Sequence, residues 1–207
     1  GITPSEVVII GSGTVGEYAA RTALGLGAIV KLFDDSVYKL RNVQNRLGAR
    51  VFTSIMQPKV LAKELKTADV AIGALHSESG TSPCVVTEDM VRNMKEGSVV
   101  VDVSIDQGGC FETSRMTSHS QPIFTKHDVI HYCVPNIPAR VPHTASFALS
   151  NYFTPVFLSS GEIGGMVNLL KTNRGLCKGV YMYNGKITNR QISNTFGLPF
   201  QSLDMLL

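Results

Sequence analysis

Short apolar runs alternate with segments of helical periodicity along the first 135 or so residues. The apolar runs have the length of buried strands and lie at Glu6–Ile10, Ile29–Phe33, Val51–Phe52, Val70–Leu75, Ser98–Ile105 and Val129–Val134. Helices are predicted between them at Thr14–Leu24, Ser36–Leu47, Gln57–Leu65 and Glu88–Met94. Strands that alternate with helices are typical of a parallel sheet with crossover helices, so the pattern predicts an α/β fold with a doubly wound parallel sheet.

The predicted helices carry recognisable start and stop residues. Ser36 and Thr87 stand where a side chain can cap the first turn, and Pro58 falls in a first turn, where its missing N–H costs nothing. Gly48 follows the second helix, where a left-handed residue is needed to end it.

The pattern changes beyond Pro142. Thr144–Ser160 is predicted to be a long helix, with Pro155 as a point where it can bend, and only short segments follow it. We therefore expect two parts, an α/β domain over residues 1–143 and a C-terminal helical segment over residues 144–207.

Composition narrows the classes of function. The 207 residues are 43% apolar and 17% charged, with a net charge of +3 and no basic block, which argues against nucleic acid as a partner. No apolar run approaches the length of a bilayer span, which argues against a membrane partner. The first residue is Gly1 rather than Met and a strand follows almost at once, so we expect that an N-terminal portion is missing.

The four cysteines are widely spaced, at Cys84, Cys110, Cys133 and Cys177. In a chain of this size they indicate reduced thiols and a cytoplasmic location rather than a disulfide framework. No Cys or His pair has the spacing of metal ligands, so no metal site is predicted.

The strongest local signal is the motif GSGTVG at residues 11–16, which lies between a predicted strand and a predicted helix. Gly11 permits a tight turn, Gly13 lets a pyrophosphate approach the backbone, and Gly16 lets the helix pack on the strand. The helix N-terminus offers free N–H groups to phosphates. The alternative is a strand, turn and helix with incidental glycines, but the placement of the motif favours a Rossmann fold that binds a dinucleotide.

Asp34 ends the second predicted strand, 18 residues after Gly16. A carboxylate there can accept hydrogen bonds from the adenosine ribose, and it would repel a 2′-phosphate, so NAD is favoured over NADP. Asp35 is adjacent and can share or take this role.

A third candidate region is VVVDVSIDQGGCFETSR at residues 99–115. Strand periodicity places Ile105 on one face, and Asp102 and Asp106 on the other. Asp106 stands at the carboxyl end of the strand, where ligands bind in open α/β sheets. From the residues alone, a substrate-orienting or proton-transferring role and a turn-capping role for Asp106 weigh equally, whereas Asp102 is better explained as a structural acid.

The sequence DVSIDQGGCFETSR followed by HDVIHYCVPNIPARVPHTASFALSN resembles the alanine dehydrogenase family, which is related to the NAD-binding subunit of proton-pumping transhydrogenases. Those transhydrogenases typically carry Asn where this chain has Cys110, which favours the dehydrogenase branch. The resemblance implies pyrophosphate contacts from Ser12, Gly13, Thr14 and Val15, a ribose contact from Asp34, and nucleotide-lining positions at Ala74 and Leu75. It further implies that Ile105 and Asp106 flank the nicotinamide with Asn136 close by, and that Asp106 is the active-site aspartate.

The same resemblance implies an NAD-dependent oxidoreductase that converts L-alanine to pyruvate and ammonium. Its substrates would be a small amino acid and the matching 2-oxo acid, and its assembly a homo-oligomer, which is a hexamer in the family. The family's substrate-binding Arg, Lys and His residues lie in a separate N-terminal region, and residues 144–207 would return to that substrate domain. We therefore expect this chain to bind NAD and to be inactive alone. The alternatives are a transhydrogenase-type NAD(H)-binding subunit and a non-catalytic NAD-sensing module.

Two segments depart from the family pattern. The loop at residues 76–85 reads HSESGTSPCV instead of the family's Pro-Gly-Ala-Lys-Ala-Pro-like sequence, and Pro135 replaces a residue that is commonly Ala. The resemblance therefore assigns no NAD contact to this loop.

Overall fold

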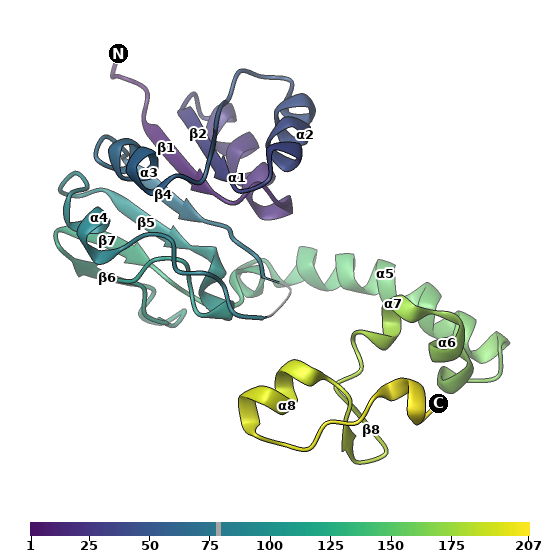
Figure 1. The fold of residues 1–207 in the computed structure, drawn as a ribbon. Coiled ribbons are helices and arrows are strands. Elements are labelled where there is room, and N and C mark those ends of the chain that lie inside the picture. Colours follow the sequence, from purple (N-terminus) through teal and green to yellow (C-terminus); the bar gives the residue numbers. More distant parts are fainter. Residues whose placement is uncertain (78–79) are drawn as a thin grey trace. The chain divides into compact units, whose positions relative to one another are not determined.

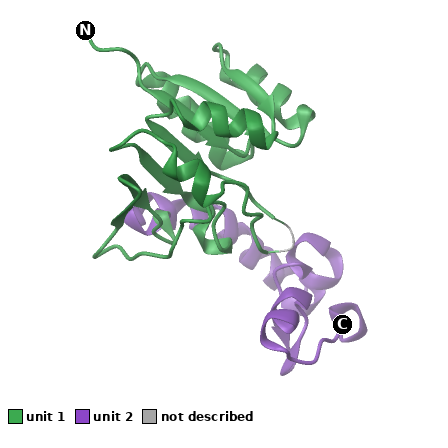
Figure 2. Cartoon of the chain, turned by 60° about the vertical axis from the view of Figure 1, so that its left-hand side comes forward, with its two compact units in different colours: residues 1–137 green, residues 138–207 purple. Residues whose placement is uncertain are grey.

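The computed structural model describes residues 1–77 and 80–207, which form two compact units, Gly1–Ile137 and Pro138–Leu207 (Figure 2). The division falls just before the long C-terminal helix begins, whereas the sequence pattern placed it after residue 143.

The first unit is built on a seven-stranded sheet with the strand order β3-β2-β1-β4-β5-β7-β6 (Figure 1). The strands are β1 (Glu6–Ile10), β2 (Ile29–Asp34), β3 (Phe52–Ile55), β4 (Val70–Gly73), β5 (Val99–Asp102), β6 (Ile123–Lys126) and β7 (Val129–Tyr132). All neighbouring strands pair in parallel except β6 and β7, which are antiparallel. The predicted α/β Rossmann architecture is confirmed, with an antiparallel strand added at one edge.

Helices cover both faces of this sheet: α1 (Thr14–Gly25), α2 (Val37–Leu47), α3 (Pro58–Leu65) and α4 (Glu88–Arg92). One core cluster joins Val7 and Ile9 of β1 to side chains of α1 and α2, and the other joins Val8 and Ile10 to side chains of α3 and α4. Alternate residues of β1 thus enter opposite cores, as a doubly wound sheet requires. The predicted caps are also present, since Ser36 accepts from the Lys39 N–H at 3.3 Å and Gly48 ends α2 in the left-handed region.

The strand predicted over Ser98–Ile105 is wrong beyond Asp102, where β5 gives way to the 3-10 helix η1 (Val103–Gln107). The side chain of Asp102 accepts a hydrogen bond from the Ser104 N–H at 3.1 Å and so turns the chain out of the strand. The expected alternation of faces fails as a result: Ser104 and Ile105 are both buried, and Asp106 is exposed.

The sequence pattern also missed strand β6. Two of its four residues are exposed and the other two are only partly buried, so the segment lacks the apolar run of an interior strand. Its hairpin turn to β7 uses His127 and Asp128, both with positive φ, in place of the Asn-Gly or Asp-Gly pair that marks such turns.

The second unit contains α5 (Pro142–Glu162), α6 (Met166–Thr172), α7 (Arg174–Cys177), α8 (Arg190–Phe196), the 3-10 turn η3 (Leu203–Met205) and a hairpin of β8 (Met182–Tyr183) and β9 (Lys186–Ile187). The long helix predicted over Thr144–Ser160 is confirmed as α5, and Pro155 lies inside it. Among the described residues, no helix combines the length and apolar character that a bilayer span requires.

Candidate functional site

The glycine turn between β1 and α1 needs two of its glycines for steric reasons. Gly11 has φ +108°, and a Cβ there would collide with the backbone of Ala74 at the end of β4. A Cβ at Gly16 would collide with the carbonyl oxygen of Gly11. Gly13 differs, because a Cβ there meets nothing within 4 Å. The open space at Gly13 is what a turn that receives a ligand against its backbone should have.

Asp34 lies at the carboxyl end of β2 and faces the glycine turn. Its Oδ2 accepts the Ser12 N–H and its Oδ1 accepts the Ser36 N–H, each at 2.8 Å. The residue is 7% exposed, whereas the neighbouring Asp35 is exposed. Each carboxylate oxygen can accept a second hydrogen bond, so Asp34 keeps capacity for a donor such as a ribose hydroxyl.

A groove of about 660 Å³ runs from Asp34 past the glycine turn. It is lined by Gly11, Gly13, Thr14, Val15, Asp34, Asp35, Ser36, Lys39, Ala74, Leu75, His76 and Pro83. A second hollow of about 290 Å³ shares four of these residues and adds Val103, Ser104, Asp106 and Gln107. The shared residues make the two hollows adjoin, so the groove leads from one carboxylate, Asp34, toward a second, Asp106.

Asp106 is exposed on η1, and its carboxylate accepts the Asn136 N–H at 3.1 Å and 3.4 Å from its two oxygens. Asn136 has φ +53°, so the turn after β7 presents its backbone N–H to the carboxylate. The structure thus brings together Asp106 and Asn136, which are 30 residues apart in sequence.

Besides Asp34 and Ala74, two predicted contact residues, Ser12 and Ile105, have buried side chains. Ser12 is 2% exposed and its N–H is already bonded to Asp34, so what it contributes is the position of that carboxylate. Ile105 is 4% exposed, and among the described residues it is Ser104 and Asp106, not Ile105, that line the second hollow. Ile105 lies inward because η1 replaces the predicted strand.

Asp102 is fully buried and structural, as its position in the sequence favoured. Its carboxylate accepts hydrogen bonds from the Cys110 N–H at 3.0 Å and the Ser114 hydroxyl at 2.7 Å, besides that from Ser104. Burial, followed by the charge of Asp102, raises the pKa of the Cys110 thiol, so this cysteine is not a thiolate at neutral pH. The loop from Gly108 to Ser114 is therefore held around one buried acid.

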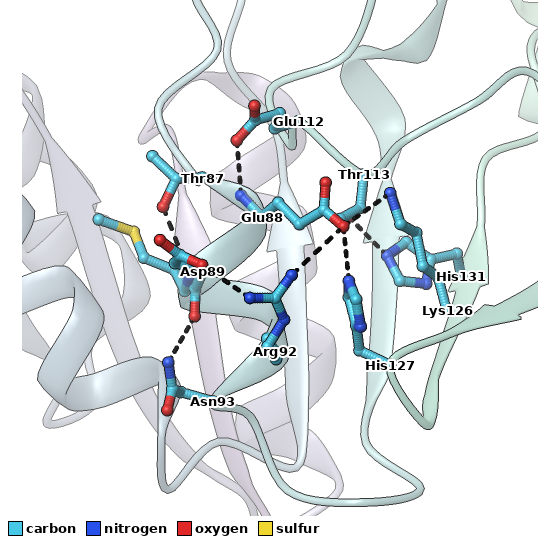
Figure 3. A network of polar contacts seen from close by, with 11 residues as sticks. Thr87, Glu88, Asp89, Arg92, Asn93, Glu112, Thr113, Lys126, His127 and His131 are labelled. Carbon is cyan, nitrogen blue, oxygen red and sulfur yellow. Dashed lines mark hydrogen bonds and ion pairs between the residues drawn. The ribbon is translucent and has the colours of Figure 1, made fainter.

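A separate polar network lies between α4 and the β6–β7 hairpin (Figure 3). Glu88 Oε1 lies 2.6 Å from His127 Nε2 and 3.1 Å from Lys126 Nζ, and these two hydrogen bonds, that of His127 first, lower the pKa of Glu88. None of these residues lines the groove, so the network joins secondary-structure elements. In the described part of the chain, no group of three His, Cys, Asp or Glu residues is arranged to hold a metal ion.

A hollow of about 650 Å³ lies elsewhere, between α1 and the starts of β1 and β4. Its walls are mainly apolar and include Leu26, Val70 and Ile72. None of its lining residues carries a carboxylate, and it lies away from the carboxyl ends of the strands. Because ligands of open α/β sheets bind at those carboxyl ends, the groove is the better candidate for the functional site.

Three polar residues that line the groove or the second hollow were not among the predicted contacts: Lys39, His76 and Gln107. Lys39 lies in the first turn of the helix that follows Asp34, and His76 directly follows the strand predicted over Val70–Leu75. The only signal for either residue was therefore its position in the sequence. Gln107 acts through contacts with distant residues, which no local pattern records.

A Rossmann-type sheet whose glycine turn faces a buried carboxylate at the end of the next strand defines a domain of the nucleotide-binding class. The sequence matches the family described as alanine dehydrogenase/PNT, C-terminal domain, over residues 1–190, and the chain belongs to that family.

Named relatives agree with this assignment. The chain is 42% identical over 200 residues to alanine dehydrogenase from Mycolicibacterium smegmatis, a match that covers 97% of the chain and 54% of the relative. It is 38% identical over 208 residues to alanine dehydrogenase 2 from Staphylococcus aureus, covering 100% of the chain and 56% of the relative. The chain thus spans about half the length of the curated relatives it matches.

Solved structures give the same result for the fold. An L-alanine dehydrogenase superposes with a TM-score of 0.86 at 37% identity, covering 95% of this chain and 54% of that one. A transhydrogenase from Sinorhizobium meliloti superposes with a TM-score of 0.68 at 22% identity, covering 77% and 46%, and shares the fold alone.

Proposed function

We propose that this chain is the NAD-binding part of an NAD-dependent alanine dehydrogenase. The observation that carries the proposal is the carboxylate of Asp34, held by two backbone N–H groups at the end of β2 and facing the glycine turn. The named relatives are alanine dehydrogenases, which supports alanine as the substrate and pyruvate with ammonium as the products.

The residues of the groove fit a dinucleotide. No side chain of the described residues caps α1, so the N–H groups of Thr14 and Val15 in its first turn are available to a pyrophosphate, and Gly13 leaves room for it. Asp34 would accept the adenosine ribose hydroxyls and disfavour a 2′-phosphate, and Ala74 and Leu75 would line the nucleotide. NAD, when bound, supplies the hydride acceptor for the reaction.

Asp106 is the proposed active-site aspartate. It is exposed in the hollow that adjoins the nucleotide groove, where a carboxylate can orient an amino group or hold a proton. The Asn136 N–H bonds to this carboxylate and so fixes its direction.

The whole protein's activity requires more than these residues. We propose that the substrate carboxylate is bound by residues outside this chain, that residues 144–207 pack against that substrate domain, and that the enzyme is a cytoplasmic homo-oligomer. Free cysteines, two of them buried, suit a reducing compartment. Helix α5 exposes large apolar side chains, among them Phe147, Tyr152 and Phe157, which suits a surface that is covered in the assembly.

Calorimetric titration of the 207-residue chain with NAD and with NADP tests the proposal. We expect NAD to bind with clear preference and the chain to oxidise no alanine by itself. If neither nucleotide binds, the assignment of the groove as a nucleotide site is refuted. If this chain alone oxidises alanine, the proposal that residues outside it bind the substrate is refuted.

A further inference from the structure

Among the described residues, four hydrogen bonds join the loop that follows β4 to the 3-10 helix η1. The Ser104 hydroxyl donates to the Leu75 carbonyl at 2.8 Å. The Ser77 N–H donates to Gln107 Oε1 at 3.0 Å, and Gln107 Nε2 donates to the Ser77 carbonyl at 3.2 Å. The Ser82 N–H donates to the Gln107 carbonyl at 2.8 Å.

Gln107 takes part in three of these four bonds. Its side-chain amide binds both backbone groups of one residue, Ser77, much as a strand neighbour would, while its own carbonyl holds Ser82. The two bonds at Ser77 must form together, because the amide is planar and presents its donor and acceptor on one edge. Gln107 therefore fixes the start and the far part of the loop relative to η1.

The two elements joined in this way both line the second hollow. Leu75 and His76 come from the loop, and Ser104 and Asp106 come from η1. Gln107 adjoins Asp106 in sequence and also lines the hollow, so its bonds help to hold the two lining elements together.

We propose that Gln107 is a positioning residue, which holds the loop after β4 against η1 at the spacing that the nicotinamide half of the cofactor requires. The inference rests on the proposed function, because it takes NAD(H) as the ligand of the groove. It also explains how a loop that departs from the family sequence is retained beside the site: its contacts to Gln107 use backbone groups, which are independent of side-chain identity.

The test is the substitution Gln107→Met in the full 207-residue chain, since Met keeps the length of the side chain and removes both polar ends. Hydrogen exchange at the Ser77 amide, followed by NMR, should accelerate at least tenfold. The dissociation constant for NADH, measured by fluorescence titration, should rise about tenfold, which corresponds to about 1.4 kcal/mol. Gln107→Glu keeps an acceptor for the Ser77 N–H, so its exchange rate should lie between those of Met and Gln.

Gln44→Met is the matched control, because Gln44 is exposed on α2 and lines neither hollow. It should change neither readout. Faster exchange at Ser77 with unchanged NADH affinity would overturn the positioning role, as would unchanged exchange. Failure of the unaltered chain to bind NADH would instead refute the proposed function, so the two failures are distinguishable.

Discussion

The two carboxylates that mark the ends of the groove are held in different ways. Asp34 is buried and receives a backbone N–H on each oxygen, from the segments that begin α1 and α2. Asp106 is exposed and receives one N–H, from the turn after β7. The carboxylate at the Asp34 end is therefore positioned by this chain's own backbone. The carboxylate at the Asp106 end is held by one backbone group and stays exposed, which fits the proposal that the substrate site is shared with the rest of the enzyme.

The largest expected effect is on the nucleotide end. Asp34→Ala should weaken NAD binding about 100-fold, equivalent to about 2.7 kcal/mol, because it removes charge-assisted hydrogen bonds to the ribose. Calorimetric titration measures this loss. Asp35→Ala is the control, and we expect a change below about threefold. An equal loss in both variants would show that Asp34 is not the selective carboxylate.

The next effect separates folding from binding at the glycine turn. Gly11→Ala should lower the free energy of unfolding by about 3 kcal/mol, because the new Cβ meets Ala74 and the residue has positive φ. Gly13→Ala should cost less than about 1 kcal/mol and still weaken NAD binding about tenfold, since its methyl group occupies the space for the pyrophosphate. Urea unfolding and titration of both variants measure the two quantities, and a large stability loss at Gly13 would contradict the assignment of open space there.

A smaller effect on NAD affinity is expected at the other end of the groove. Asp106→Asn should leave the NAD affinity of this chain within about twofold, because the side chain keeps its size and the proposed ribose and pyrophosphate contacts lie at Asp34 and the glycine turn. In the intact enzyme the same substitution should reduce alanine oxidation at least 100-fold. If Asp106→Asn weakened NAD binding as much as Asp34→Ala, the contrast between the two ends would be wrong.

The smallest effect concerns a carboxylate outside the groove. Glu88 has a pKa below its ordinary value of 4.5 because of His127 and then Lys126, so its contribution to stability is present above pH 4.5 and is lost as the pH falls through the lowered pKa. Glu88→Gln should flatten this part of a thermal unfolding profile taken between pH 3 and pH 7. Glu96→Gln is the control, because Glu96 is exposed and forms no ion pair among the described residues, and it should leave the profile unchanged.

Local sequence predicted the geometry of the glycine turn and the position of Asp34 well, because the determinants of both are local. The apolar run before GSGTVG, the glycines and the spacing to Asp34 each reflect a backbone requirement of one turn or one strand. The Asp106 end was predicted less well. Its geometry depends on the buried carboxylate of Asp102, which ends β5 early, and on bonds from Gln107 and Asn136 to residues about 30 positions away. Such contacts follow from the folded sheet and leave no periodic signal.

The paired N–H bonds of Asp34 have a thermodynamic consequence. Ser12 and Ser36 open two different helices, so a single carboxylate already immobilises the starts of both before any ligand arrives. The turn loses its conformational entropy during folding. Binding of a nucleotide there therefore does not have to order the turn a second time. Association at this end should therefore resemble the docking of a rigid body, with little change in amide exchange across the starts of α1 and α2.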